Sequence, residues 1–98
     1  MIITDRNALR FKTIAASLLD GAWHEGTEAN PARILINAAM ELNSAAVDIH
    51  QLQNRYAGPK SGAALDRLRV LAGMDIPPEL LELVTIAIYD IGQVRSNF

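Results

Sequence analysis

Apolar residues recur at helical spacing along most of the chain, and clusters of glycine and proline interrupt that pattern. The clusters fall at residues 21–31, 58–62, 73–78 and at residue 92. Because glycine and proline disfavour the interior of a helix, these clusters mark the places where helices end. The pattern predicts an all-α protein, a compact antiparallel bundle of about four helices at approximately 5–20, 31–57, 61–72 and 77–93.

The first predicted helix begins at Thr4 or Asp5, either of which can cap it, and ends before Gly21. Its apolar residues repeat at intervals of three and four, which produces one buried stripe. The stripe consists of Phe11, Ile14, Ala15, Leu18, Leu19 and Ala22. The polar residues of this segment, Arg6 and Arg10 among them, share the opposite face, which we expect to contact water.

The second predicted helix has the clearest boundaries. Asn30 is a favourable N-cap and Pro31 suits the first helical position, while Gly58 and Pro59 favour a stop. Apolar residues alternate by three and four between these limits, as in a packed helical seam. The seam consists of Leu35, Ala38, Leu42, Ala45, Ile49, Leu52 and Tyr56. A helix this long needs more than one shorter neighbour to cover it.

The last predicted helix is apolar on nearly every side. Residues 84–89 also have the composition of a strand, but the length of the apolar run favours a helix. An apolar helix of this kind must be buried on most sides, at the centre of the bundle or against another chain. We expect a twofold homodimer, with a monomeric bundle as the alternative. The expected self-association face is Leu81, Val84, Ile88 and Ile91.

Composition limits the class of protein. The chain has 98 residues, which suits a single helical domain spanning 1–98. Half of the residues are hydrophobic, which excludes an intrinsically disordered chain. The net charge of -2 gives no overall attraction to nucleic acid, and cysteine is absent. No apolar run is long enough to cross a membrane and no signal peptide is evident, so we expect a cytoplasmic protein.

The two histidines are the first candidates for catalysis. His50 flanks the seam and has no acidic residue at helical spacing, so we expect a structural role. His24 lies in a loop with Glu25 and Glu28, but these residues match no known metal-ligand spacing. We expect Trp23 to anchor this loop against the end of the bundle. The sequence therefore predicts no enzyme, no metal and no cofactor.

Basic residues point to a partner. Lys60 and Ser61 lie between glycines before a predicted helix, a composition that can hold an anion, but the spacing is not that of a P-loop and we expect an ordinary loop. Elsewhere, Arg6 and Arg10 repel each other at a spacing of four residues without any evident structural reason. We expect the partner-binding residues to be Arg6, Arg10, Arg67 and Arg69, facing an acidic protein surface.

These features favour a non-enzymatic protein–protein interaction module. It would act sterically, as a small inhibitor, adaptor or phage- or mobile-element-like modulator. The alternative is a helix-turn-helix DNA-binding regulator using residues 61–92, because residues 68–75 loosely resemble the turn of that motif. Glu79 and Glu82 would repel phosphate there, so nucleic acid is not the expected partner. A second alternative is a small metal-dependent hydrolase around His24.

Overall fold

The computed structural model describes residues 5–24 and 26–98, in which four α-helices form and no strand. The helices are α1 (Asp5–Trp23), α2 (Ala29–His50), α3 (Asn54–Ala72) and α4 (Pro78–Arg95). This architecture confirms the predicted all-α class. Residues 84–89 lie within α4, so the strand interpretation of that segment is wrong. Thr4, one of the two predicted caps of the first helix, lies outside the described residues.

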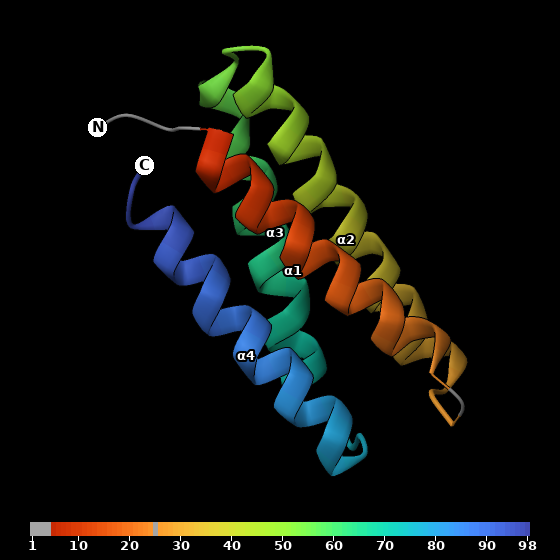
Figure 1. Cartoon of the computed structure of the whole chain (residues 1–98). Coiled ribbons are helices and arrows are strands. Elements are labelled where there is room, and N and C mark those ends of the chain that lie inside the picture. The colour runs from red at the N-terminus through yellow and green to blue at the C-terminus, as the bar shows by residue number, and fades with distance from the viewer. Residues whose placement is uncertain (1–4, 25) are drawn as a thin grey trace.

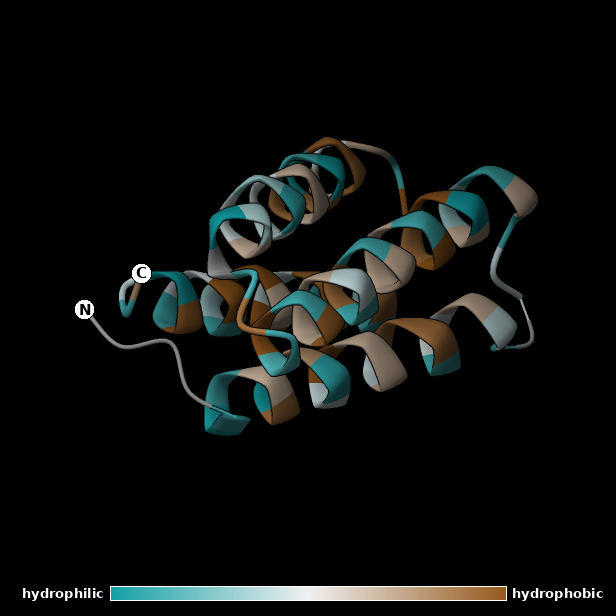
Figure 2. Cartoon of the chain, turned by 90° about the horizontal axis from the view of Figure 1, so that it is seen from above, coloured by the Kyte–Doolittle hydropathy of each residue, from teal (hydrophilic) through white to brown (hydrophobic). Residues whose placement is uncertain are grey.

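Successive helices run in opposite directions and lie side by side (Figure 1). Each helix packs against the one before it and the one after it, and α4 also returns to pack against α1. The bundle measures 39 × 19 × 18 Å along its principal axes. Hydrophobic and hydrophilic positions alternate along each ribbon, which is the banding of amphipathic helices (Figure 2). The result is a closed ring of four helices around one apolar core.

Alanines bring α1 and α2 close together. The alanines on the facing sides of these helices are fully or almost fully buried, namely Ala8, Ala15, Ala22, Ala38, Ala39, Ala45 and Ala46. Because alanine extends little beyond the backbone, two helices that meet through it approach closely. By comparison, α4 packs less extensively against α1 and α3, through the larger residues Leu80, Val84 and Ile91. It occupies one corner of the bundle rather than its centre.

The second helix ends earlier than its sequence predicts. The seam residues from Leu35 to Ile49 are buried as expected, but the helix stops at His50. Leu52 then adopts a φ of 58° and is 84% exposed. Its N–H donates to the Ile49 carbonyl at 3.1 Å, and the Gln53 N–H donates to the Asp48 carbonyl at 2.7 Å. This is a Schellman motif with leucine in the position that usually holds glycine.

The early stop makes a third helix that is long enough to cover α2. A single helix over 31–57 would extend past α1, whereas a reversal at residues 51–53 places α3 alongside α2. As a result, the predictions that the seam continues through Leu52 and Tyr56 and that the third helix begins at Ser61 are wrong. Tyr56 is 42% exposed on the first turn of α3.

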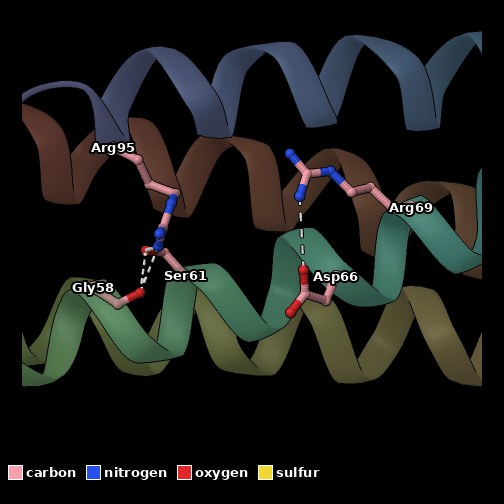
Figure 3. A network of polar contacts seen from close by, with 5 residues as sticks. All are labelled: Gly58, Ser61, Asp66, Arg69 and Arg95. Atoms are coloured by element: carbon pink, nitrogen blue, oxygen red, sulfur yellow. Dashed lines mark hydrogen bonds and ion pairs between the residues drawn. The ribbon is translucent and has the colours of Figure 1, made fainter.

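Gly58 and Pro59 lie inside α3 rather than ending a helix. Pro59 removes one amide donor and crowds the carbonyl of Arg55, but Arg55 belongs to the first turn, where the cost of a distortion is small. The Gly58 carbonyl accepts hydrogen bonds from Arg95 Nη1 and, at 3.1 Å, from Ser61 Oγ (Figure 3). These contacts hold the segment against α4, so the expected loop at 58–62 is helical.

The other boundaries differ by a few residues. The second helix begins at Ala29, with Glu28 rather than Asn30 at the N-cap, and Pro31 stays within the first turn.

The residues after α4 contact the start of α1. Asn97 Nδ2 donates to Asn7 Oδ1 at 3.2 Å, and the Phe98 ring meets the Phe11 ring edge-on, with 6.0 Å between centroids.

Replacing Leu52 with glycine should stabilise the protein. A left-handed backbone costs a side-chain-bearing residue about 1 kcal/mol, and the exposed leucine contributes little burial in return. We expect Leu52→Gly to raise the free energy of unfolding by about 0.5–1 kcal/mol in urea titrations. Leu52→Ala is the control and should change it much less, because alanine keeps the strain. Equal effects of the two substitutions would contradict this explanation.

Candidate functional site

A groove runs between α1 and α4. Three hollows form it, and neighbouring hollows share lining residues: the middle one, of about 330 Å³, shares Glu79 and Leu83 with the hollow at one end and Thr13, Ile14 and Asp90 with that at the other. We call this continuous hollow the α1–α4 groove. The residues that line it are Arg6, Leu9, Arg10, Thr13, Ile14, Ser17, Asp20, Gly21, His24, Gly26, Thr27, Pro77, Glu79, Leu80, Glu82, Leu83, Ile86, Ala87 and Asp90.

Short polar side chains on α1 keep the groove open. Thr13 Oγ1 donates to the Leu9 carbonyl at 3.0 Å, and Ser17 Oγ donates to the Thr13 carbonyl at 3.3 Å. Both hydroxyls therefore fold back onto their own helix instead of reaching α4. Leu83 of α4 packs directly on Gly21 of α1, where a Cβ would lie 3.3 Å from Leu83 Cδ1. The polar face of α1, expected to contact only water, is one wall of this groove.

The groove combines a buried apolar floor with an exposed apolar rim. Ile14 and Ala87 at its floor are almost fully buried. Ile86 on the α4 wall is 54% exposed and Leu9 on the α1 side is 63% exposed. Exposed side chains of this size are also present on other faces of the chain, and what sets these two apart is that they border a buried apolar floor.

Charged side chains are segregated along the groove. Arg6 and Arg10 line one end, with Asp90 across from them. Asp20, Glu79 and Glu82 line the middle and the other end. In the described part of the chain, none of these six residues takes part in an ion pair. The charges at the groove are therefore available to a partner.

Arg67 and Arg69, the other two predicted partner-binding residues, already have partners within the chain. Arg67 pairs with Glu41 of α2, and Arg69 Nη1 lies 3.8 Å from Asp66 Oδ1 on its own helix (Figure 3). Both lie on α3, which does not pack against α1. The structure thus brings Arg6 and Arg10 together but leaves Arg67 and Arg69 elsewhere.

A second ion pair between α2 and α3 lies two helical turns away from the pair of Arg67 and Glu41. Lys60 Nζ lies 2.6 Å from Asp48 Oδ2, and Asp48 is buried. Glu41 and Asp48 are seven residues apart on α2, and Lys60 and Arg67 are seven apart on α3, which is the register of two antiparallel helices. The spacing of Glu41 and Asp48 along their own helix does not predict these pairs, because it gives no sign of a neighbouring helix.

The four predicted self-association residues do not lie on one exposed surface. Val84 and Ile91 have no exposed surface and belong to the core of the chain, while Ile88 is partly buried against that core. Leu81 is 40% exposed and lies about 140° around the helix from Ile86. The face therefore does not exist as one surface, and the exposed apolar residue of α4 at the groove is Ile86.

His24 lies at the acidic end of the α1–α4 groove. Glu28 is the N-cap of α2, and Glu25 lies outside the described residues. Across residues 5–24 and 26–98, no three residues of the His, Cys, Asp and Glu types are grouped as metal ligands would be. Trp23 is 78% exposed, so the expectation that it covers the end of the bundle is wrong.

His50 has a partner that its own helix does not reveal. Its Nδ1 lies 3.1 Å from Asp5 Oδ1 of α1, and its Nε2 lies 3.5 Å from Lys12 Nζ. An imidazole that donates through Nδ1 and accepts through Nε2 satisfies both contacts. Asp5 is well exposed, and the three residues link the ends of α1 and α2. This geometry supports a structural role for His50.

The chain matches no protein-family model, no curated protein and no solved structure. Its class is therefore defined by its own fold and site, as a four-helix bundle with a charged, apolar-floored groove. Among the helices of the described residues, none combines the length and apolarity that a membrane span requires.

The contact of Lys60 with Asp48 should be measurable in a double-mutant cycle. We expect Lys60→Ala to lower the free energy of unfolding by about 2 kcal/mol, because it leaves the buried Asp48 carboxylate without its partner. Asp48→Ala should cost about 1 kcal/mol, because the partly exposed Lys60 ammonium stays hydrated, and the coupling energy should be about 1 kcal/mol. Arg69→Ala, which removes an exposed pair, is the control and should cost less than about 0.5 kcal/mol. Strictly additive effects at Asp48 and Lys60 would refute the coupling.

Proposed function

We propose that the protein is a non-enzymatic protein–protein interaction module of the cytoplasm that holds an amphipathic helix of a partner protein in the α1–α4 groove. It acts sterically, as an inhibitor or adaptor that occupies the partner's helix. The observation that carries this proposal is the continuous groove itself, with its buried apolar floor, exposed apolar rim and available charges.

The dimensions of the groove suit a helix. Along α1 it extends from Arg6 to His24, 18 residues apart, or about 27 Å at 1.5 Å per residue. A helix of about 15 residues would lie along most of that length. Such a helix would place apolar residues at intervals of three and four over Ile14, Leu83 and Ile86. It would pack against α1 and α4 as those helices pack against their other neighbours.

The side chains of the groove support binding rather than catalysis. The hydroxyls of Thr13 and Ser17 donate to backbone carbonyls of α1 instead of to a base. Thr27 Oγ1 likewise donates to the Gly21 carbonyl of α1, at 2.9 Å. A nucleophilic hydroxyl needs a base within hydrogen-bond distance, and these hydroxyls are engaged elsewhere.

The two alternative functions have less support. A helix-turn-helix regulator needs a second helix that projects from the domain, whereas α4 lies lengthwise against α3 and α1 (Figure 1). Its first turns also carry Glu79 and Glu82. A metal hydrolase would need three or more ligands that converge, and although Asp20 and Glu79 line the same hollow as His24, no such group is present among the residues that the structure describes.

A neutral amphipathic peptide tests the groove directly. The probe has about 15 residues, blocked ends, leucines at intervals of three and four, and only Gln, Ser and Ala elsewhere. We expect its titration into ¹⁵N-labelled protein to shift the amides of Thr13, Ser17, Leu83 and Ile86. Ile86→Asp should weaken binding at least about tenfold, because it places a carboxylate over the apolar floor.

Leu81→Asp is the matched control for Ile86→Asp. It makes the same kind of change at an exposed apolar residue of the same helix, but outside the groove. We expect its peptide affinity to equal that of the unaltered protein. Shifts spread over other faces, or equal losses from both substitutions, would exclude the groove as the binding site.

A further inference from the structure

The two ends of the α1–α4 groove differ in charge. Among the described residues, those that line the middle and one end include Asp20, Glu79, Glu82 and His24 but no lysine or arginine. Arg6 and Arg10 line the other end against the single carboxylate of Asp90. The groove is therefore acidic over most of its length and has an excess of positive charge at one end.

A helix seated on the apolar floor would cover these charges and remove water from them. Burying a charge without a partner costs several kcal/mol, so the charges of the groove disfavour any helix that does not carry complementary charges. An acidic helix would meet Glu79 and Glu82 as like charges. A helix with basic residues near Glu79 and Glu82 and an acidic residue near Arg6 and Arg10 would satisfy both ends.

The dipole of the bound helix also favours one direction. The N-terminal end of a helix carries a partial positive charge and the C-terminal end a partial negative charge. The first is favoured beside Asp20, Glu79 and Glu82, and the second beside Arg6 and Arg10. Such a helix runs parallel to α4, which starts at the same acidic end of the groove, and antiparallel to α1.

A second copy of this chain fits the groove less well. The groove carries two arginines and four carboxylates, so two copies that faced each other would bring an excess of negative charge together. A partner with a basic helix has no such conflict.

We infer that the α1–α4 groove binds a predominantly basic amphipathic helix of another protein, parallel to α4, with its basic residues over Glu79 and Glu82 and its acidic C-terminal turn at Arg6 and Arg10. The inference rests on the proposed function, since it names the partner of the same groove. It also changes the expected chemistry of the partner from an acidic surface to a basic helix.

Three peptides with the apolar face of the neutral probe test the inference. One is neutral, one has lysines in its N-terminal two thirds and glutamates in its last turn, and one has the two charges exchanged. We expect the lysine-first peptide to bind at least about tenfold tighter than the neutral one at low salt, with the difference shrinking as salt screens the charges. A nitroxide at its N-terminus should broaden the amides around Glu79 and Glu82, not those around Arg6 and Arg10.

The variant Glu82→Lys should remove most of that preference. Asp66→Lys is the matched control, because it makes the same change in net charge at an exposed residue of α3 outside the groove, and its affinity should stay unchanged. Because Glu82 and Asp66 are both exposed, and Asp66 loses only its exposed pair with Arg69, neither variant should unfold the protein, and circular dichroism checks this.

The outcomes separate this inference from the proposed function. If the neutral peptide binds as tightly as the lysine-first peptide, or if the exchanged peptide binds best, the charge inference is overturned while the groove remains a binding site. Broadening around Arg6 and Arg10 would overturn the direction. If no peptide binds, the proposed function fails. A concentration-dependent dimer in sedimentation that Ile86→Asp dissociates would assign the groove to a second copy and overturn the inference.

Discussion

The close contact of α1 and α2 through alanine determines how the rest of the bundle is arranged. Two helices joined through small side chains form a compact pair, against which the remaining helices must pack with larger residues. The third helix is held to α2 by apolar seam residues and by the pairs of Asp48 with Lys60 and Glu41 with Arg67. The fourth helix closes the ring less extensively, and the groove lies where it meets α1.

This arrangement of helices also determines which charged residues form ion pairs within the chain. The basic residues of α3 neutralise carboxylates of α2, so they contribute to the folded structure and not to a binding surface. Such pairs fix the register of two helices, since a slip by one turn would leave both carboxylates without a partner. The charged residues of α1 and α4 that line the groove form no ion pair in the described structure, namely Arg6, Arg10, Asp20, Glu79, Glu82 and Asp90.

Hydrophobic spacing predicts much of this fold. The buried stripe of α1, the first five seam residues of α2 and the helical state of α4 all follow from it. The reversal at Leu52 does not, because a leucine there gives no local sign of a left-handed turn and the motif depends on hydrogen bonds to Asp48 and Ile49. Gly58 and Pro59 give the opposite error: they predict the end of a helix, but the helix continues through them because they lie near its first turn. The sequence predicts part of the candidate site, because Arg6 and Arg10 stand out as unpaired basic residues. It does not predict the groove, because whether their face contacts water or another helix depends on packing.

The groove lies between the first and last helices of the fold, and no loop connects these two helices directly. Their separation is set by side chains alone: Asn7 with Asn97 and Phe11 with Phe98 near one end, and Gly21 against Leu80 and Leu83 at the other. Between these two points no turn fixes the distance between the helices, so the packing of side chains such as Ile14 and Ala87 at the floor of the groove sets it. A substitution at this seam can therefore change the width of the groove without straining a turn, whereas each of the other three helix pairs is joined by a loop.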